Sequence, residues 1–169
     1  VLVTPDGAQS FVYCPAASYE FEANMIDAKR IANSAMLVLE SFMLDGHLSA
    51  FVFRHSADLA LASRRAIALN LNDPELVARH RGFIGHFIES HCQIVVGNIE
   101  EYYALLGTRD LDAVVAELTA YSIGKNKLLA VTLGARGAVV VNHGISARIP
   151  AVQLPPGARL HSTGAGDHF

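Results

Sequence analysis

The sequence predicts an α/β fold in which a mostly parallel sheet is flanked by helices on both faces. Short runs rich in Val, Ile and Leu alternate along the chain with amphipathic segments of helical periodicity. The apolar runs are nearly continuous, which is typical of strands that are buried on both sides of a parallel sheet. The chain has 169 residues, of which 51% are hydrophobic, and this is enough for one domain with a sizeable core.

Five apolar segments are predicted to be the strands of this sheet. The third and fourth are the strongest, because they are rich in Val, Ile and Leu and each closes on Gly or Asn. The fifth follows the fourth after a short Gly-Ala-Arg-Gly link, which predicts an antiparallel neighbour. The opening VLVTPDG resembles a further strand that enters a turn. The five segments are 35–42, 66–71, 93–98, 128–134 and 137–142.

Amphipathic segments between these strands are predicted to be helices. The first segment places Met25, Ile26 and Ile31 roughly along one face. The other three open on residues that cap helix N-termini or start a first turn, and the last closes on a glycine. The segments are 22–33, 56–66 opening on Ser56, 74–90 with Pro74 behind Asp73, and 110–124 between Asp110 and Gly124.

Composition excludes several classes of function. A formal charge of −3 gives no basis for binding nucleic acid or an anionic membrane, and no apolar run is long enough to span a bilayer. Cys14 and Cys92 lack metal-ligand spacing, so we expect reduced thiols and a cytoplasmic protein. His80, His86 and His91 are not spaced as a helical metal face.

Ligands of open α/β sheets bind outside the carboxyl ends of the strands, so the residues after each strand are the candidates for a site. Asn98 and Glu101 follow the third strand and share one face of a helical turn. They could position a hydrated magnesium ion or a phosphate through water. A capping box at a helix N-terminus explains the same spacing, and the pattern alone leaves both interpretations open.

Two glycine-rich stretches follow later strands. Thr132, Gly134 and Gly137 could let the backbone approach a ligand closely, or could form only a tight turn that needs positive φ angles. The second stretch is Ser162–Asp167, in which successive backbone N–H groups could bind an anion. A carboxylate among phosphate-facing amides is explained if Asp167 takes the proton of a hydroxyl that attacks phosphorus. A plain glycine turn capped by Asp is the alternative.

Taken in order, these segments resemble the ribokinase-like PfkB family of sugar and nucleoside kinases. STGAGDHF is similar to the family's second signature, VVGNIEE to its N-x-x-E segment, and AVTLGARGAVVV to the strand-turn-strand at its nucleotide site. LNLNDPELVARHR, TPDGAQSF and VYCPAASY resemble the adenosine-kinase-like branch. The resemblance spans nearly the whole chain.

The resemblance implies that the γ-phosphoryl group of ATP is transferred to a primary hydroxyl of a small molecule. It implies a base at Asp167 and an anion hole formed by the amides of Gly164, Ala165 and Gly166. It places Mg²⁺ and the phosphates at Asn98 and Glu101, and ATP along Thr132, Gly134, Gly137 and Thr163. The expected partners are ATP and a nucleoside, with no nucleic acid and no membrane, in a monomer or homodimer. A sugar or sugar-acid acceptor and a non-catalytic nucleotide-binding module are the alternatives.

The sequence departs from the family at several positions. His161 replaces an Asp that helps to hold a monovalent cation in many members, which argues against a potassium requirement. His168 and Ile99 also differ from the common residues. Members begin with a double-glycine segment and lid strands and continue past the signature into helices. We therefore expect residues 1–169 to be one domain that is incomplete at both ends and inactive when isolated.

Overall fold

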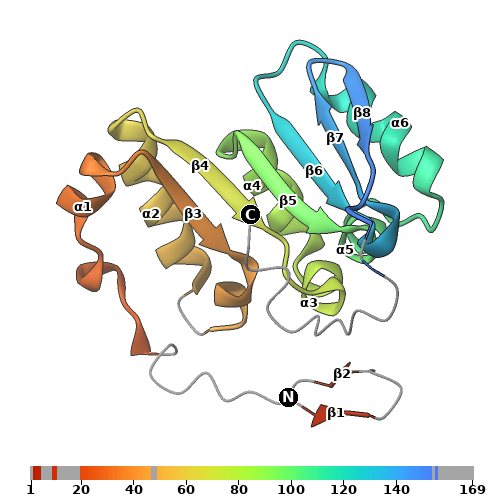
Figure 1. Ribbon diagram of the computed structural model, residues 1–169. Helices are drawn as coiled ribbons and strands as arrows, with labels where there is room; N and C mark the ends of the chain where they lie inside the picture. Colours follow the sequence, from red (N-terminus) through yellow and green to blue (C-terminus); the bar gives the residue numbers. More distant parts are fainter. Residues whose placement is uncertain (1, 5–8, 11–19, 47–48, 154, 156–169) are drawn as a thin grey trace.

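The computed structural model describes residues 2–4, 9–10, 20–46, 49–153 and 155. Within these residues six strands form one sheet in the order of the sequence, and the first four run parallel (Figure 1). The last two are antiparallel. The strands are β3 (Met36–Glu40), β4 (Ala66–Asn70), β5 (Ile94–Asn98), β6 (Leu128–Thr132), β7 (Ala138–Asn142) and β8 (Ile145–Ile149). A separate antiparallel pair joins β1 (Leu2–Val3) and β2 (Gln9–Ser10). The predicted mostly parallel α/β fold is confirmed.

The helices of the described part cover one face of the sheet and lie behind it in Figure 1. Each parallel strand pairs with the next along the sequence. Right-handed crossovers taken repeatedly in one direction place all their helices on the same side. Helices were predicted on both faces of the sheet. They are observed on one face, and the described residues place no helix on the other. The helices are α1 (Ala28–Asn33), α2 (Ser49–Ala62), α3 (Pro74–Arg79), α4 (Arg81–Ser90), α5 (Ile99–Leu106) and α6 (Leu111–Ser122). None of those described could cross a membrane.

The five predicted strands all occur, with ends displaced by at most two residues. The antiparallel neighbour expected after the Gly-Ala-Arg-Gly link is β7. In the six-stranded sheet, β8 was not predicted, because every residue of its ISARI sequence is exposed and the segment has no apolar run. An edge strand of this kind is specified by its partner, β7, and by the turn at Gly144, where φ is +76°.

Two predicted helices are interrupted. Residues 22–33 contain a 3₁₀ turn, η2 (Ala23–Met25), followed by the short helix α1. α1 begins there because the Asp27 side chain accepts hydrogen bonds from the backbone of the next turn. Residues 74–90 form two helices, because His80 leaves helical geometry at φ −104° and ψ 16°. The ring of His80 contacts Asp45 at 2.8 Å instead.

The predicted N-caps have mixed outcomes. Asp73 and Asp110 cap α3 and α6 as expected. The prediction for Ser56 is wrong, because α2 begins seven residues earlier and Ser56 lies inside it. Its hydroxyl donates to the carbonyl of Val52 at 2.8 Å, which satisfies a buried polar group within the helix.

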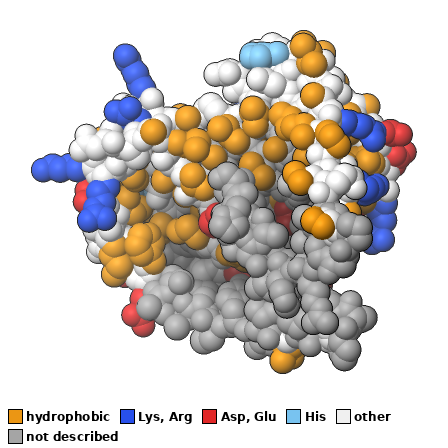
Figure 2. Space-filling view, in the orientation of Figure 1, with side chains coloured by type: hydrophobic (Ala, Val, Ile, Leu, Met, Phe, Trp, Pro, Cys, Tyr) orange, Lys and Arg blue, Asp and Glu red, His pale blue; other side chains and the backbone are white. Residues whose placement is uncertain are grey.

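The core lies between the sheet and the helix layer. Alternate strand residues point into it, and helix residues meet them, among them Leu39, Leu69, Val95, Leu129, Phe53, Phe87 and Val114. The intervening strand residues point to the opposite face. There Met36 and Val38 remain 37% and 43% exposed. Figure 2 shows hydrophobic side chains gathered across this face. We call it the open face of the sheet, because no described helix covers it.

Candidate functional site

The parallel strands all end in polar residues. Glu40, Asn70, Asn98 and Thr132 are the last residues of β3, β4, β5 and β6. Glu40 pairs with Asn70 across the sheet, and Asn98 pairs with Thr132. Their preceding neighbours point mainly into the core, so all four side chains belong to the open face. This polar row marks the carboxyl edge, where ligands of such sheets bind.

Asn98 and Glu101 form the capping box at the start of α5. Glu101 N donates to Asn98 Oδ1 at 3.0 Å, and Asn98 N and Nδ2 donate to the Glu101 carboxylate at 2.8 and 2.6 Å. Only 3% of Glu101 is exposed. This burial raises the pKa of Glu101 to about 7, against the lowering effect of the Asn98 backbone N–H, and the nearby Asp73 adds to the rise. The capping interpretation is therefore what the structure shows for this pair.

The stretch after β6 forms a tight turn, η4 (Gly134–Arg136), between β6 and β7. Gly134 and Gly137 have φ angles of +59° and +89°. A Cβ atom on Gly137 would lie 2.0 Å from the carbonyl oxygen of Ile149, so this glycine is required by the strand packing. The turn interpretation is therefore also observed here. Thr132 is exposed at the end of β6, directly beside Asn98.

The third motif lies outside the described residues. It contains the predicted base, Asp167, and the predicted anion hole, Gly164, Ala165 and Gly166. It also contains Thr163, which was predicted to lie along ATP. His161, His168 and Cys14 also lie outside them. Their roles remain predictions from the sequence.

Sequence reasoning overlooked three residues of the carboxyl edge. Glu40, at the end of β3, accepts hydrogen bonds at one oxygen, Oε2, from Asn70 Nδ2 at 3.2 Å and from Asn72 Nδ2. Asn72 lies two residues after the end of β4 and adopts a left-handed conformation with φ +63°. The predicted segments 35–42 and 66–71 extended past these residues to Phe42 and Leu71, so Glu40 and Asn70 were placed inside strands and not at their ends.

No group of three or more metal-ligating residues occurs in the described part of the chain. Two of the three histidines considered above contact other groups. His80 pairs with Asp45, and the ring of His91 stacks on Phe87 with 4.6 Å between centroids. Cys92 is a free, buried thiol, and burial raises its pKa to about 12. Burial of this kind disfavours the thiolate, the form that acts as a nucleophile or metal ligand.

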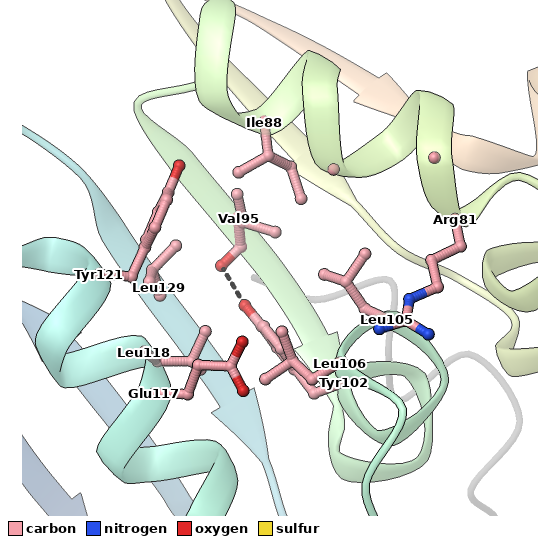
Figure 3. Close-up of a pocket in the computed structure, with 12 residues that line it drawn as sticks. Arg81, Ile88, Val95, Tyr102, Leu105, Leu106, Glu117, Leu118, Tyr121 and Leu129 are labelled. Carbon is pink, nitrogen blue, oxygen red and sulfur yellow. Dashed lines mark hydrogen bonds between the residues drawn. The ribbon is translucent and has the colours of Figure 1, made fainter.

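A pocket of about 390 Å³ lies among α4, α5 and α6 (Figure 3). Val95 and Leu129 form its floor on the helix-covered face, and the Tyr102 hydroxyl donates to the Val95 carbonyl beside it at 3.2 Å. Glu117 and Arg81 approach it from opposite sides. The polar row points to the other face of the sheet, so this pocket is separate from the candidate site.

Comparison with known proteins identifies the family. The family model described as pfkB family carbohydrate kinase matches residues 1–169. The chain belongs to the PfkB family. Comparison with curated proteins gave no match.

Solved structures of PfkB-type proteins share the fold. An adenosine kinase from Sinorhizobium meliloti is 30% identical with a TM-score of 0.79, and a probable sugar kinase from Rhizobium etli is 24% identical with the same score. Each alignment covers 88% of this chain and 44% of the other. A putative ribokinase II from E. coli, in complex with ATP and Mg²⁺, is 16% identical with a TM-score of 0.71, covering 88% of this chain and 47% of that one. The chain thus spans less than half the length of these structures.

Proposed function

We propose that this PfkB chain belongs to an ATP-dependent kinase that phosphorylates a primary hydroxyl of a nucleoside. The observation that carries the proposal is the pairing of Asn98 with Thr132. It brings two segments that are far apart in the sequence, the N-x-x-E turn and the glycine turn, side by side at the carboxyl edge of the sheet. This is where nucleotides bind in open α/β folds.

The polar row divides this edge into two halves. Asn98 and Thr132 end the β5–β6 half, and Glu40 and Asn70 end the β3–β4 half. Strands are spaced about 4.8 Å apart, so β3 and β5 lie roughly 10 Å from each other. That separation suits ATP phosphates on one half and an acceptor on the other. We assign the acceptor to the half that ends in Glu40, whose carboxylate can accept hydrogen bonds from hydroxyl groups.

In the proposed reaction Asp167 takes the proton of the acceptor hydroxyl as its oxygen attacks the γ-phosphorus of ATP. The bond from that phosphorus to the β,γ-bridging oxygen breaks, and ADP leaves. The amides of Gly164, Ala165 and Gly166 would stabilise the charge on the transferred group. Such a reaction depends on positioning and charge stabilisation more than on covalent chemistry.

Magnesium fits beside Asn98 and Glu101 only if these side chains contact its water ligands and not the ion itself. Glu101 is buried, and its carboxylate already accepts two hydrogen bonds from Asn98. Mg²⁺ commonly keeps several waters and binds substrate phosphates with one or two carboxylates. When bound with ATP it would neutralise phosphate charge, and Asn98 and Glu101 would contact its waters. Thr132, Gly134, Gly137 and Thr163 would lie along the nucleotide.

A nucleoside acceptor is supported by the 30% identity to the Sinorhizobium adenosine kinase. The family description, carbohydrate kinase, favours a sugar or sugar acid as the second candidate. A panel of adenosine, fructose, ribose and a keto-deoxy sugar acid, tested with the full-length protein, ATP and Mg²⁺, distinguishes the two. Phosphorylation of adenosine alone is the expected result. A preference for a sugar or sugar acid would contradict the nucleoside assignment and support the second candidate.

The base is tested by the Asp167→Asn substitution in the full-length protein. We expect a loss of turnover of roughly 10³-fold or more, because acceptor deprotonation is removed, whereas ATP binding stays nearly unchanged. Turnover is measured with the best acceptor of the panel and ATP binding by calorimetry. A variant that keeps most of its turnover would refute the assignment of Asp167.

A further inference from the structure

Asn72 connects the ends of β3 and β4 through one side-chain amide. Its Oδ1 accepts a hydrogen bond from Ser41 N at 2.7 Å, and its Nδ2 donates to Glu40 Oε2. These partners lie 31 and 32 positions away in the sequence. The left-handed backbone at Asn72, with φ +63°, turns the side chain back towards β3. Asn tolerates this conformation better than most residues, but Gly would adopt it more easily.

The hydrogen bonds to Glu40 converge on a single oxygen. Asn70 and Asn72 both donate to Oε2, and none of the described residues donates to Oε1. A glutamate side chain is otherwise free to rotate about three bonds, and two amide donors remove most of that freedom. Within the described part of the chain, the carboxylate is therefore held at Oε2, and Oε1 has no donor there.

We propose that Asn72 is a positioning residue for the acceptor, acting by orienting Glu40 so that Oε1 accepts a hydrogen bond from an acceptor hydroxyl. The inference rests on the proposed kinase function and deepens it, because it requires an acceptor with a second hydroxyl besides the one that is phosphorylated. A left-handed residue that needed only to make the turn would be served better by Gly. The amide of Asn72 supplies what Gly lacks.

The first test is the Asn72→Gly substitution in the full-length protein. Gly keeps the left-handed turn but removes the amide. We expect the KM for the acceptor to rise about tenfold, as for the loss of a hydrogen bond to a charged group, with the KM for ATP unchanged. An acceptor KM equal to that of the unaltered protein, in a variant that unfolds at the same temperature, would overturn the proposal.

Two control variants separate positioning from folding. Arg64 also has a left-handed backbone, with φ +57°, and it lies at the opposite end of β4, so Arg64→Gly changes the same backbone preference away from the site. The Ser41 hydroxyl donates to the Leu71 carbonyl, so Ser41→Ala loosens the same turn without touching Glu40. Neither variant should change the acceptor KM. If Ser41→Ala raised it as much as Asn72→Gly does, turn rigidity rather than Glu40 orientation would be the cause.

A second test compares the best acceptor with analogues that each lack one hydroxyl. In the unaltered protein one of these analogues should lose about tenfold in kcat/KM, because Glu40 then lacks its partner. In Asn72→Gly that loss should largely disappear. An equal loss in both proteins would refute the proposal while leaving the kinase function intact. Failure of the unaltered protein to phosphorylate any acceptor would refute both the kinase function and the role of Asn72. That outcome is distinct from an equal loss in the two proteins.

Discussion

Burial changes the acidity of one candidate site residue, Glu101. Its carboxylate is almost fully enclosed in the first turn of α5, and its two hydrogen bonds from Asn98 do not offset the loss of water. The pKa of Glu101 therefore rises from 4.5 to about 7. A proton binds more tightly in the folded protein than in the unfolded chain, which links folding to pH at this one side chain.

The linkage predicts how stability changes with pH. The contribution of Glu101 to the free energy of unfolding is fully present below pH 4.5 and is lost as pH rises through about 7. The loss is on the order of 3 kcal/mol. In Glu101→Gln this decline should be missing, although a hydrogen bond to the Asn98 backbone is weakened. Urea unfolding of both proteins between these pH values measures the difference. Parallel pH curves would show that Glu101 titrates normally.

At the scale of elements, Lys127 secures the end of α4 to the sheet. Its ammonium group donates to the carbonyls of Ile88, Glu89 and Cys92 at 2.6, 3.1 and 2.7 Å. These carbonyls lie at or just beyond the C-terminus of the helix, where a positive charge is favourable. Lys127 is 9% exposed and burial lowers its pKa, yet the three acceptors compensate the buried charge.

The Lys127→Met substitution should lower the free energy of unfolding by roughly 3 kcal/mol, because it leaves buried carbonyls without a donor. Lys125→Met is the matched control. Lys125 also bears an ammonium group near the same helix, but it forms a partly exposed ion pair with Glu89 at 2.9 Å. That variant should lose less than about 1 kcal/mol. Equal losses in urea unfolding would contradict the assignment.

The β6–β7 turn depends on one of its two glycines more than on the other. At Gly137 a Cβ atom would collide with the backbone of Ile149, whereas at Gly134 nothing lies within 4 Å. Gly137→Ala should therefore destabilise the protein by at least about 3 kcal/mol, and Gly134→Ala by only about 1 kcal/mol. Thermal unfolding checks the order, and a reversed order would be incompatible with this turn.

At the scale of the whole molecule, one aromatic cluster joins helices of the covering layer. Phe53 of α2 meets Phe83 and Phe87 of α4 with centroids 6.1 and 4.8 Å apart. Phe53 is fully buried, and edge-on contacts of this kind add to the burial of apolar area. The cluster lies over the core, so it couples packing of the helix layer to the sheet that carries the polar row.

Phe53→Ala should lower the free energy of unfolding by about 4 kcal/mol, because it leaves a cavity between α2 and α4. Phe51, two residues earlier, is 63% exposed and stacks on the ring of His55. Phe51→Ala should change stability by less than about 1 kcal/mol. Denaturant unfolding of the two variants provides the comparison. A small effect of Phe53→Ala would mean that the helix layer does not depend on this cluster.

Much of the fold could be predicted because its signals are local. The apolar runs at 66–71 and 93–98 need no distant partner to be recognised as strands, and Asp73 before Pro74 is a local helix start. The motif order predicted the family, which the family model confirms. Asn98 and Glu101 are predicted to meet because they are three positions apart in one helical turn.

Other features were decided only by tertiary contacts. The break at His80 accompanies its contact with Asp45, which lies 35 residues away. The pairing of Glu40 with Asn72 arises because β3 and β4 end at the same level of the sheet, and no local pattern shows that. The sequence by itself determined which segments form most of the strands and which polar residues lie at or near their ends. The sheet decided which of those residues meet, because its strand order brings distant segments to one edge.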